Sequence, residues 1–413
     1  MVRILTSREV RAVVNQTLRY ELQGNEPVIK NANDWFTVLA ANYYGFDQYV
    51  PAAIMASALS KAPILLEISP GSARGASYSG KKGSMADHVK EATALMEVHR
   101  ERTNPYVLAT PDGEKGIDGR DAAVALMIDH DKFGDYLKAS KGSYEAAKKA
   151  FLGEIDDVFR ASGDVFSYLM VDAAEGTTIN QNVELSRLVL QMARQYNTVI
   201  EIEFSATGGL GEEGAGKESE VAEMDPTQKR EYIKKIYDFI ERVTEGHLDN
   251  LAGVAFDAGL THVGRAGEVR SLELGLLNWY QTYGLKRFGY AIPFVGHGGT
   301  SLSTEEAMHE ARGLIGKLNK ATEPKRTVLQ EQARFVWNDT PLIAANLLGA
   351  PLETTSEYMG NVVTKNTLDD THHPKNTLFL PAYALVKLYQ GYIRALGSEN
   401  RTPQLMEKGI IGR

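Results

Sequence analysis

The feature of this sequence that most constrains its fold is a repeated alternation of short apolar segments with longer helical ones. The apolar runs lack the strict alternation of a half-exposed strand, which is typical of parallel strands covered on both faces. Between them, apolar residues recur at helical spacing. The predicted strands span residues 36–41, 64–68, 122–128, 165–171, 199–204, 251–256, 290–295 and 313–318.

About eight strand–helix units at a spacing of roughly 30 residues match a TIM (β/α)8 barrel. A doubly wound open sheet is the structural competitor, but its six or so strands would leave two of the runs unused. We therefore predict an α/β chain whose 413 residues form a single domain. It begins with an amphipathic N-terminal helix, followed by a TIM barrel at about 30–323 and a helical C-terminal extension at about 324–413.

Composition limits the chemistry and the partners. The chain has no cysteine, so a metal ion would have to be held by His, Asp and Glu. A formal net charge of −8 argues against nucleic acid as the main partner, because phosphate backbones bind a basic face. No apolar signal core or membrane-length apolar run is visible. We expect a cytoplasmic protein without a membrane partner, and a homo-oligomer.

Three of the nine histidines, His130, His262 and His297, lie at or just past the ends of predicted strands. In a barrel these ends converge on one mouth. A single His there is more often a hydrogen-bonded structural residue, but three on separate strands, with carboxylates between them, favour a metal site. The pair His372–His373 is better interpreted as a solvated loop, because adjacent histidines cannot easily face one ion.

A glycine-rich turn surrounds the last of these histidines. His297 is followed by Gly298, Gly299, Thr300 and Ser301. Exposed backbone N–H groups and a helix N-terminus together favour an anion, and Ser303 and Glu306 have the spacing of a capping box. A buried structural turn is the alternative interpretation. The pattern nevertheless indicates a phosphate-binding turn beside a metal-capable side chain.

Carboxylates follow the strands that lie between the histidines. Asp129 precedes His130, Asp172 ends the fourth predicted strand, and Glu201 and Glu203 fall on one face of the fifth. The glycine-rich acidic segment 205–214 comes next. Movable lids over reactive sites have this composition, although plain surface loops also do.

In this order the motifs resemble those of the class II, metal-dependent fructose-bisphosphate aldolases and their ketose-bisphosphate aldolase relatives. The resemblance runs from about Asn42 to Thr322. The motifs that carry it are Asp129-His130, Met170-Val171-Asp172, Glu201-Ile202-Glu203 with Thr207-Gly208-Gly209, His262, His297-Gly298-Gly299-Thr300-Ser301 and Lys317-Leu318-Asn319.

The resemblance implies a zinc enzyme that cleaves a ketose phosphate, with fructose 1,6-bisphosphate as the default substrate. His130, His262 and His297 would hold Zn²⁺ or another divalent metal, with Glu203 and Asp172 as further or alternate ligands. A monovalent cation is also compatible with it. The phosphorylated sugar would be bound by Asn42, Ser69, Gly264, Gly298, Gly299, Thr300, Ser301, Lys317, Asn319 and Thr322.

The catalytic carboxylates have two expected roles. Asp129 would exchange a proton with the aldehyde or alcohol oxygen, and Glu213 or Glu212 would move the proton at the carbon beside the carbonyl. Alternatively, Asp129 only orients His130. An imine-forming Lys317 is disfavoured because it leaves the histidines unexplained.

Other functions remain open from the sequence. The chain could act on tagatose bisphosphate or on a deoxy or sulfo sugar phosphate. A metal-dependent hydrolase barrel would usually place paired ligands on the first strand, and this chain has none there. A barrel that binds sugar phosphate without turnover is the third alternative.

Overall fold

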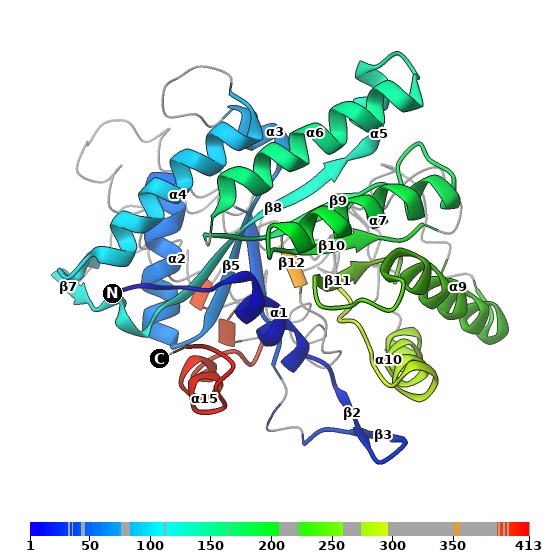
Figure 1. Ribbon diagram of the computed structural model, residues 1–413. Helices are drawn as coiled ribbons and strands as arrows, with labels where there is room; N and C mark the ends of the chain where they lie inside the picture. The colour runs from blue at the N-terminus through cyan, green and yellow to red at the C-terminus, as the bar shows by residue number, and fades with distance from the viewer. Residues whose placement is uncertain are drawn as a thin grey trace, which may run out of the picture.

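The computed structural model describes most of the barrel core and both ends of the chain. The described residues are 1–31, 34, 36–42, 46–75, 83–110, 113–163, 165–205, 221, 224–258, 274–295, 352–354, 386, 389–390, 393–394 and 396–412. Figure 1 shows a curved central sheet with helices along its outer face. The predicted eighth strand at 313–318 lies outside the described residues.

The central sheet is parallel throughout its described ladders. Its order is β11-β10-β9-β8-β5-β4-β12, and β1 pairs alongside the start of β8. From β4 to β11 the spatial order follows the chain order, as expected for repeated right-handed strand–helix units. The strands are β1 (Arg3–Ile4), β4 (Leu39–Asn42), β5 (Pro63–Ile68), β8 (Ala123–Lys132), β9 (Phe166–Asp172), β10 (Val199–Glu203), β11 (Leu251–Ala255) and β12 (Leu352–Thr354).

Two parts of the sheet differ from the sequence prediction in detail. In the predicted strand at 290–295, Phe294 forms an isolated parallel bridge to Val254. The short strand β12 falls within the predicted C-terminal extension, yet Leu352–Thr354 pairs with β4. The extension thus contributes a strand to the sheet, while its boundary at about residue 323 stays a prediction.

Helices connect the strands and begin at the capping residues that the sequence provides. Ser84, Thr178 and Asp225 each form a capping box, which satisfies backbone N–H groups of the first turn. No helix in the described ranges is long and apolar enough to cross a membrane. The helices are α1 (Ser7–Gln16), α2 (Phe46–Ser60), α3 (Pro70–Gly75), α4 (Met85–Glu101), α5 (Phe133–Ala139), α6 (Tyr144–Ser162), α7 (Ile179–Gln195), α9 (Pro226–Thr244), α10 (Leu274–Phe288) and α15 (Arg401–Glu407).

Two antiparallel hairpins stand apart from the central sheet. The first joins β2 (Tyr20–Gln23) to β3 (Glu26–Ile29). The second joins β6 (Tyr106–Thr110) to β7 (Gly113–Ile117). A short 3-10 helix at Gly119–Asp121 then leads into β8.

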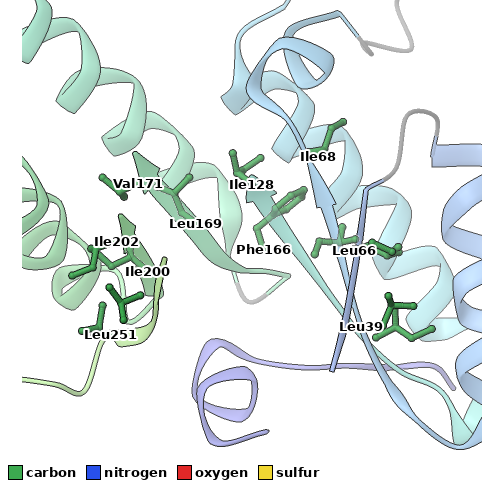
Figure 2. Packing of buried hydrophobic residues seen from close by; sticks show 14 of the residues in the cluster. Leu39, Leu66, Ile68, Ile128, Phe166, Leu169, Val171, Ile200, Ile202 and Leu251 are labelled. Atoms are coloured by element: carbon green, nitrogen blue, oxygen red, sulfur yellow. The ribbon is translucent and has the colours of Figure 1, made fainter. Parts of the chain in front are cut away.

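The core has an outer layer between the strands and the helices. Alternate residues of each strand point outward, such as Leu169 and Val171 in β9 and Ile200 and Ile202 in β10 (Figure 2). Full burial of such a side chain stabilises the fold by about 1.5–3 kcal/mol. The sheet is therefore held to its helices by a continuous apolar layer.

A second, smaller core fills the inside of the curved sheet. Helix α1 contributes Val10, Val13 and Val14 to this inner cluster, and the C-terminal segment contributes Leu405 and Ile411. Because β1, just before α1, pairs with the start of β8, this cluster covers the N-terminal ends of the strands. The strands themselves add Ala40, Leu65, Ala125, Met127, Tyr168, Val199 and Ala252.

The packing of α10 against α9 predicts a strong effect of a small substitution. A Cβ atom at Gly284 would lie 1.9 Å from the Tyr237 Oη atom. We expect Gly284→Ala to lower the free energy of unfolding by about 1–3 kcal/mol, because overpacking forces the tyrosine or the helix to move. Urea denaturation with linear extrapolation measures this loss.

Gly153→Ala in α6 is the matched control, since a Cβ atom there meets nothing within 4 Å. This substitution should stabilise the protein by about 0.5–1 kcal/mol, because Ala has the higher helix propensity. Equal effects of the two substitutions would contradict the packing described for Gly284.

Candidate active site

Buried acidic side chains gather at the C-terminal ends of the central strands. Asp129, Asp172, Glu201 and Glu203 are all buried, with Asp129 at 8 % exposure the most accessible. They come from the neighbouring strands β8, β9 and β10. Because these strands are parallel, their C-terminal ends share one edge of the sheet. Burial of several carboxylates at one edge is unfavourable without hydrogen-bond or charge partners. The contacts of each carboxylate therefore indicate whether it has a structural or a chemical role.

An irregularity in the β8–β9 ladder lies at the predicted catalytic residues. Ile128 pairs with Leu169 and Asp131 pairs with Val171, so Asp129 and His130 together stand opposite one residue of β9. A bulge of this kind bends a strand and redirects its side chains. Asp129 and His130 are both buried at the strand end, as is every residue of β8 before Lys132.

The two bulge residues contact each other directly. Oδ1 of Asp129 accepts the backbone N–H of His130 at 2.7 Å and also contacts Nδ1 of the His130 ring. A carboxylate at Nδ1 favours the tautomer with its proton there, so Nε2 keeps the lone pair that a metal ion needs. This contact is the one expected if Asp129 orients His130.

Asp172 extends this group of charges to β9. Its Oδ1 atom accepts backbone N–H groups from Ala174 at 3.1 Å and Glu175 at 3.3 Å. Burial raises the pKa of Asp172, and the nearby charges of His130 and Lys132 oppose that rise. The structure thus brings the carboxylate of β9 into electrostatic contact with the imidazole of β8.

The two glutamates of β10 have different surroundings. The hydroxyl group of Tyr168 donates a hydrogen bond to Glu201 in the barrel interior. Glu203 lies two residues closer to the strand end, and its backbone carbonyl accepts a hydrogen bond from Asn182 at 3.0 Å. Glu201 is therefore tied to the packed interior, whereas Glu203 lies at the same end of the sheet as Asp172.

A second polar network holds the far side of the β8 bulge. The hydroxyl of Tyr136 lies 3.1 Å from Oδ1 of Asp131 and donates to Glu154 at 2.7 Å. Arg74 binds Glu154 through two nitrogens, at 3.1 and 3.0 Å. Burial raises the pKa of Asp131 to about 7, although Arg74 lies close enough to oppose this. Asp131 is therefore anchored to α5, α6 and α3.

The Asp131 network and a further buried acid, Glu67, were not predicted from the sequence. Glu67 is 0 % exposed and pairs in register with Asn42 on β4 and Met127 on β8. It lies two residues beyond Leu65 in the same strand, so both side chains point to the barrel interior. The available signal was a single acidic residue within the apolar strand Pro63–Ile68.

The structure brings together only part of the predicted site. Asp129, His130, Asp172 and Glu203 lie at the strand ends, Asn42 ends β4, and half-buried Ser69 follows β5. Within the described ranges, no group of three or more His, Asp or Glu side chains could hold a metal ion. The remaining predicted residues lie outside those ranges: Glu212, Glu213, His262, Gly264, His297, Gly298, Gly299, Thr300, Ser301, Lys317, Asn319 and Thr322.

Repeated parallel strand–helix units with an imidazole and carboxylates at the C-terminal strand ends define an α/β-barrel enzyme. The family model for class II fructose-bisphosphate aldolase matches residues 26–401. The chain belongs to this family. It is therefore a TIM barrel and a carbon–carbon lyase of the aldolase type, which confirms the fold and the enzyme class predicted from sequence.

Solved structures agree with this fold. The fructose-bisphosphate aldolase (Fba) of Campylobacter jejuni is similar with a TM-score of 0.57 and 14 % identity, over 97 % of each chain. The YdjI aldolase of Escherichia coli K12 gives a TM-score of 0.50 and 14 % identity, over 90 % of this chain and 95 % of its own. No curated protein matches the chain.

The Asp131 network predicts that the Tyr136 hydroxyl contributes to stability. We expect Tyr136→Phe to lower the free energy of unfolding by about 1–3 kcal/mol, because buried Asp131 and half-buried Glu154 lose the hydroxyl that lies between them. Thermal and urea unfolding measure the loss.

Tyr144→Phe is the matched control, since the Tyr144 hydroxyl donates to Glu184, whose side chain is 39 % exposed and also binds Lys148. Its loss should be smaller, at most about 1 kcal/mol, because water can replace the donor. A Tyr144 variant as unstable as the Tyr136 variant would show that the network has no special role.

Proposed function

We propose that this chain is a zinc-dependent aldolase that reversibly cleaves a ketose phosphate. Its default substrate is fructose 1,6-bisphosphate, which would give dihydroxyacetone phosphate and glyceraldehyde 3-phosphate. The observation that carries this proposal is the family match across residues 26–401. The Asp129–His130 pair at the end of β8 supports it, because the pair combines a metal-capable nitrogen with a proton acceptor.

One described residue, His130, has the surroundings of a metal ligand. A histidine whose Nδ1 contacts a carboxylate is the usual arrangement around a metal-binding imidazole, and His130 has it. His262 and His297 would complete the set, with Glu203 and Asp172 as further or alternate ligands. A bound divalent ion would act as a Lewis acid toward the negative charge that develops on the ketose fragment.

The chain's own residues would hold and move the protons. In the cleavage direction Asp129 would accept the proton of the substrate hydroxyl beside the breaking bond, and would return it during condensation. Glu213 or Glu212 would deliver a proton to the carbon beside the carbonyl of the released triose phosphate. Because these transfers occur at different atoms, two separate carboxylates are needed.

Backbone and polar groups at the barrel mouth would bind the phosphorylated sugar. Glycine-rich backbone at the mouth of a barrel suits a phosphate, since its N–H groups can approach the anion closely. A monovalent cation could accompany the phosphate, and a cytoplasmic homo-oligomer is the expected setting. The proposed contacts are Asn42, Ser69, Gly264, Gly298, Gly299, Thr300, Ser301, Lys317, Asn319 and Thr322.

The substrate is tested by release of triose phosphate from a panel of ketose mono- and bisphosphates by the zinc-loaded protein. Fructose 1,6-bisphosphate should give the highest kcat/KM. A higher value for tagatose bisphosphate, or for a deoxy or sulfo sugar phosphate, would reassign the substrate within the same chemistry. Binding of the panel without any cleavage would refute the enzymatic proposal.

Metal removal should abolish cleavage. We expect chelation with EDTA to stop triose phosphate release and added Zn²⁺ to restore it, while borohydride should trap no substrate on the protein. His297→Ala should also lose bound zinc, as measured by metal analysis of the purified protein. Substrate trapped on Lys317, or full zinc content in the His297 variant, would contradict the proposed metal site.

Glu213→Gln should slow proton exchange at the carbon beside the carbonyl of dihydroxyacetone phosphate by about 10²–10⁴-fold, the usual contribution of a general acid or base. Zinc content should stay unchanged. Exchange is followed by loss of isotope label from that carbon. Glu212→Gln is the matched variant, and a loss confined to it would assign the role to Glu212.

A further inference from the structure

A pocket of about 460 Å³ lies at the opposite end of the barrel from the candidate active site. It is formed where the segment between α1 and β4 meets the C-terminal helix α15. Phe36 and Leu405 on its wall also belong to the inner apolar cluster that covers the N-terminal strand ends. The lining is completed by Gln16, Leu18, Tyr20, Glu21, Lys30, Asn31, Asp34, Arg401, Gln404 and Lys408.

Positive charge predominates in this pocket. Lys30, Arg401 and Lys408 line it, against the carboxylates of Glu21 and Asp34. A fourth cation, Arg19, is only 2 % exposed and donates a hydrogen bond to the backbone carbonyl of Phe36 at 3.2 Å. The lining therefore carries an excess of one positive charge, and buried Arg19 lies behind it.

These cations lie close enough to repel one another. Burial, together with the nearby charge of Arg401, lowers the pKa of Arg19 to about 9. Burial also lowers the pKa of Lys30, with Arg19 and Lys408 adding to the effect and Glu21 opposing it. A bound anion would offset both the desolvation and the repulsion, since opposite charge favours the charged form of each base.

The wall of the pocket is not uniformly polar. Leu18, Phe36 and Leu405 provide apolar surface beside the charges. The guanidinium of Arg401 lies 5.3 Å from the centre of the Phe36 ring, and donates to Gln404 at 2.7 Å. A planar guanidinium held in this way is suited to phosphate or carboxylate groups. The expected ligand therefore combines anionic groups with a small organic body.

We propose that this pocket binds a small organic dianion that carries phosphate or carboxylate groups. The site is distinct from the candidate active site, because the inner core separates the two ends of the barrel. It would connect the start of β4 to the C-terminal segment, where Thr37 N–H already donates to the Leu396 carbonyl at 2.9 Å. Binding would stabilise the attachment of α15 by mass action.

Calorimetric titration of the full-length protein with phenyl phosphate and, separately, with succinate, both organic dianions at neutral pH, tests this proposal at low ionic strength. We expect saturable binding of at least one of the two anions. The double variant Lys30→Gln/Lys408→Gln should weaken it at least about tenfold, equivalent to about 1.4 kcal/mol. Preference for phenyl phosphate would identify a phosphate ligand, and preference for succinate a carboxylate ligand.

Two further variants show whether a change in affinity comes from the pocket itself or from a general change in net charge or folding. Lys115→Gln/Lys235→Gln removes two exposed lysines remote from the lining residues, and should leave the affinity unchanged. Asp34→Asn removes a carboxylate from the pocket, and should tighten binding. Affinity that is unchanged in the Lys30/Lys408 variant, or absence of binding to both anions, would overturn the proposal.

The binding test does not depend on the proposed function. Calorimetry measures association of the anion whether or not the protein cleaves a sugar phosphate. Conversely, the Lys30/Lys408 variant should release triose phosphate at the wild-type rate when the anions are absent. A rate that falls with the loss of both lysines would place them in the catalytic machinery and contradict a separate site.

Discussion

The structure of the candidate site depends on the register of the parallel ladder between β8 and β9. A regular ladder would place Asp129 and His130 on opposite faces of the strand, one toward the interior and one toward the helices. The extra residue in β8 interrupts this alternation at Asp129 and His130, which both lie buried at the strand end. Asp131 follows at once on the outer side, where Tyr136 and Arg74 hold it. The β8–β9 pairing, the bulge and the contacts of Asp131 therefore together fix the position of Asp129 and His130.

The barrel separates two different tasks along its axis. At the C-terminal strand ends, buried carboxylates lie beside an imidazole, where proton transfer and metal binding are expected. At the N-terminal ends, α1 and the C-terminal residues pack an apolar cluster. The electropositive pocket beyond that cluster faces away from the acidic edge. Charges of opposite sign are therefore kept apart by a packed core, which limits their mutual influence.

Much of this organisation could be predicted from sequence, because short strands and capped helices are local signals. The predicted strands at 64–68 and 199–204 have clear apolar patterns, and the structure confirms them at Pro63–Ile68 and Val199–Glu203. The pairing of Leu352–Thr354 with β4 depends on contacts between residues far apart in sequence, so it could not be predicted from local patterns. The bulge and the Asp131 network were not predicted for the same reason. The spacing of apolar residues indicates helices and strands, but not the register of paired strands or the hydrogen bonds between elements. The metal set was predicted from order and resemblance, and His262 and His297 remain predictions.

The Asp131 network has a consequence for how this barrel can diverge. Its four side chains come from a strand and three helices, and each accepts or donates to at least one other. A single replacement among them disturbs partners on several elements, so neutral drift at these positions should proceed through paired changes. Laboratory evolution toward new sugars would then start more productively from the connecting segments at the barrel mouth than from α5 or α6.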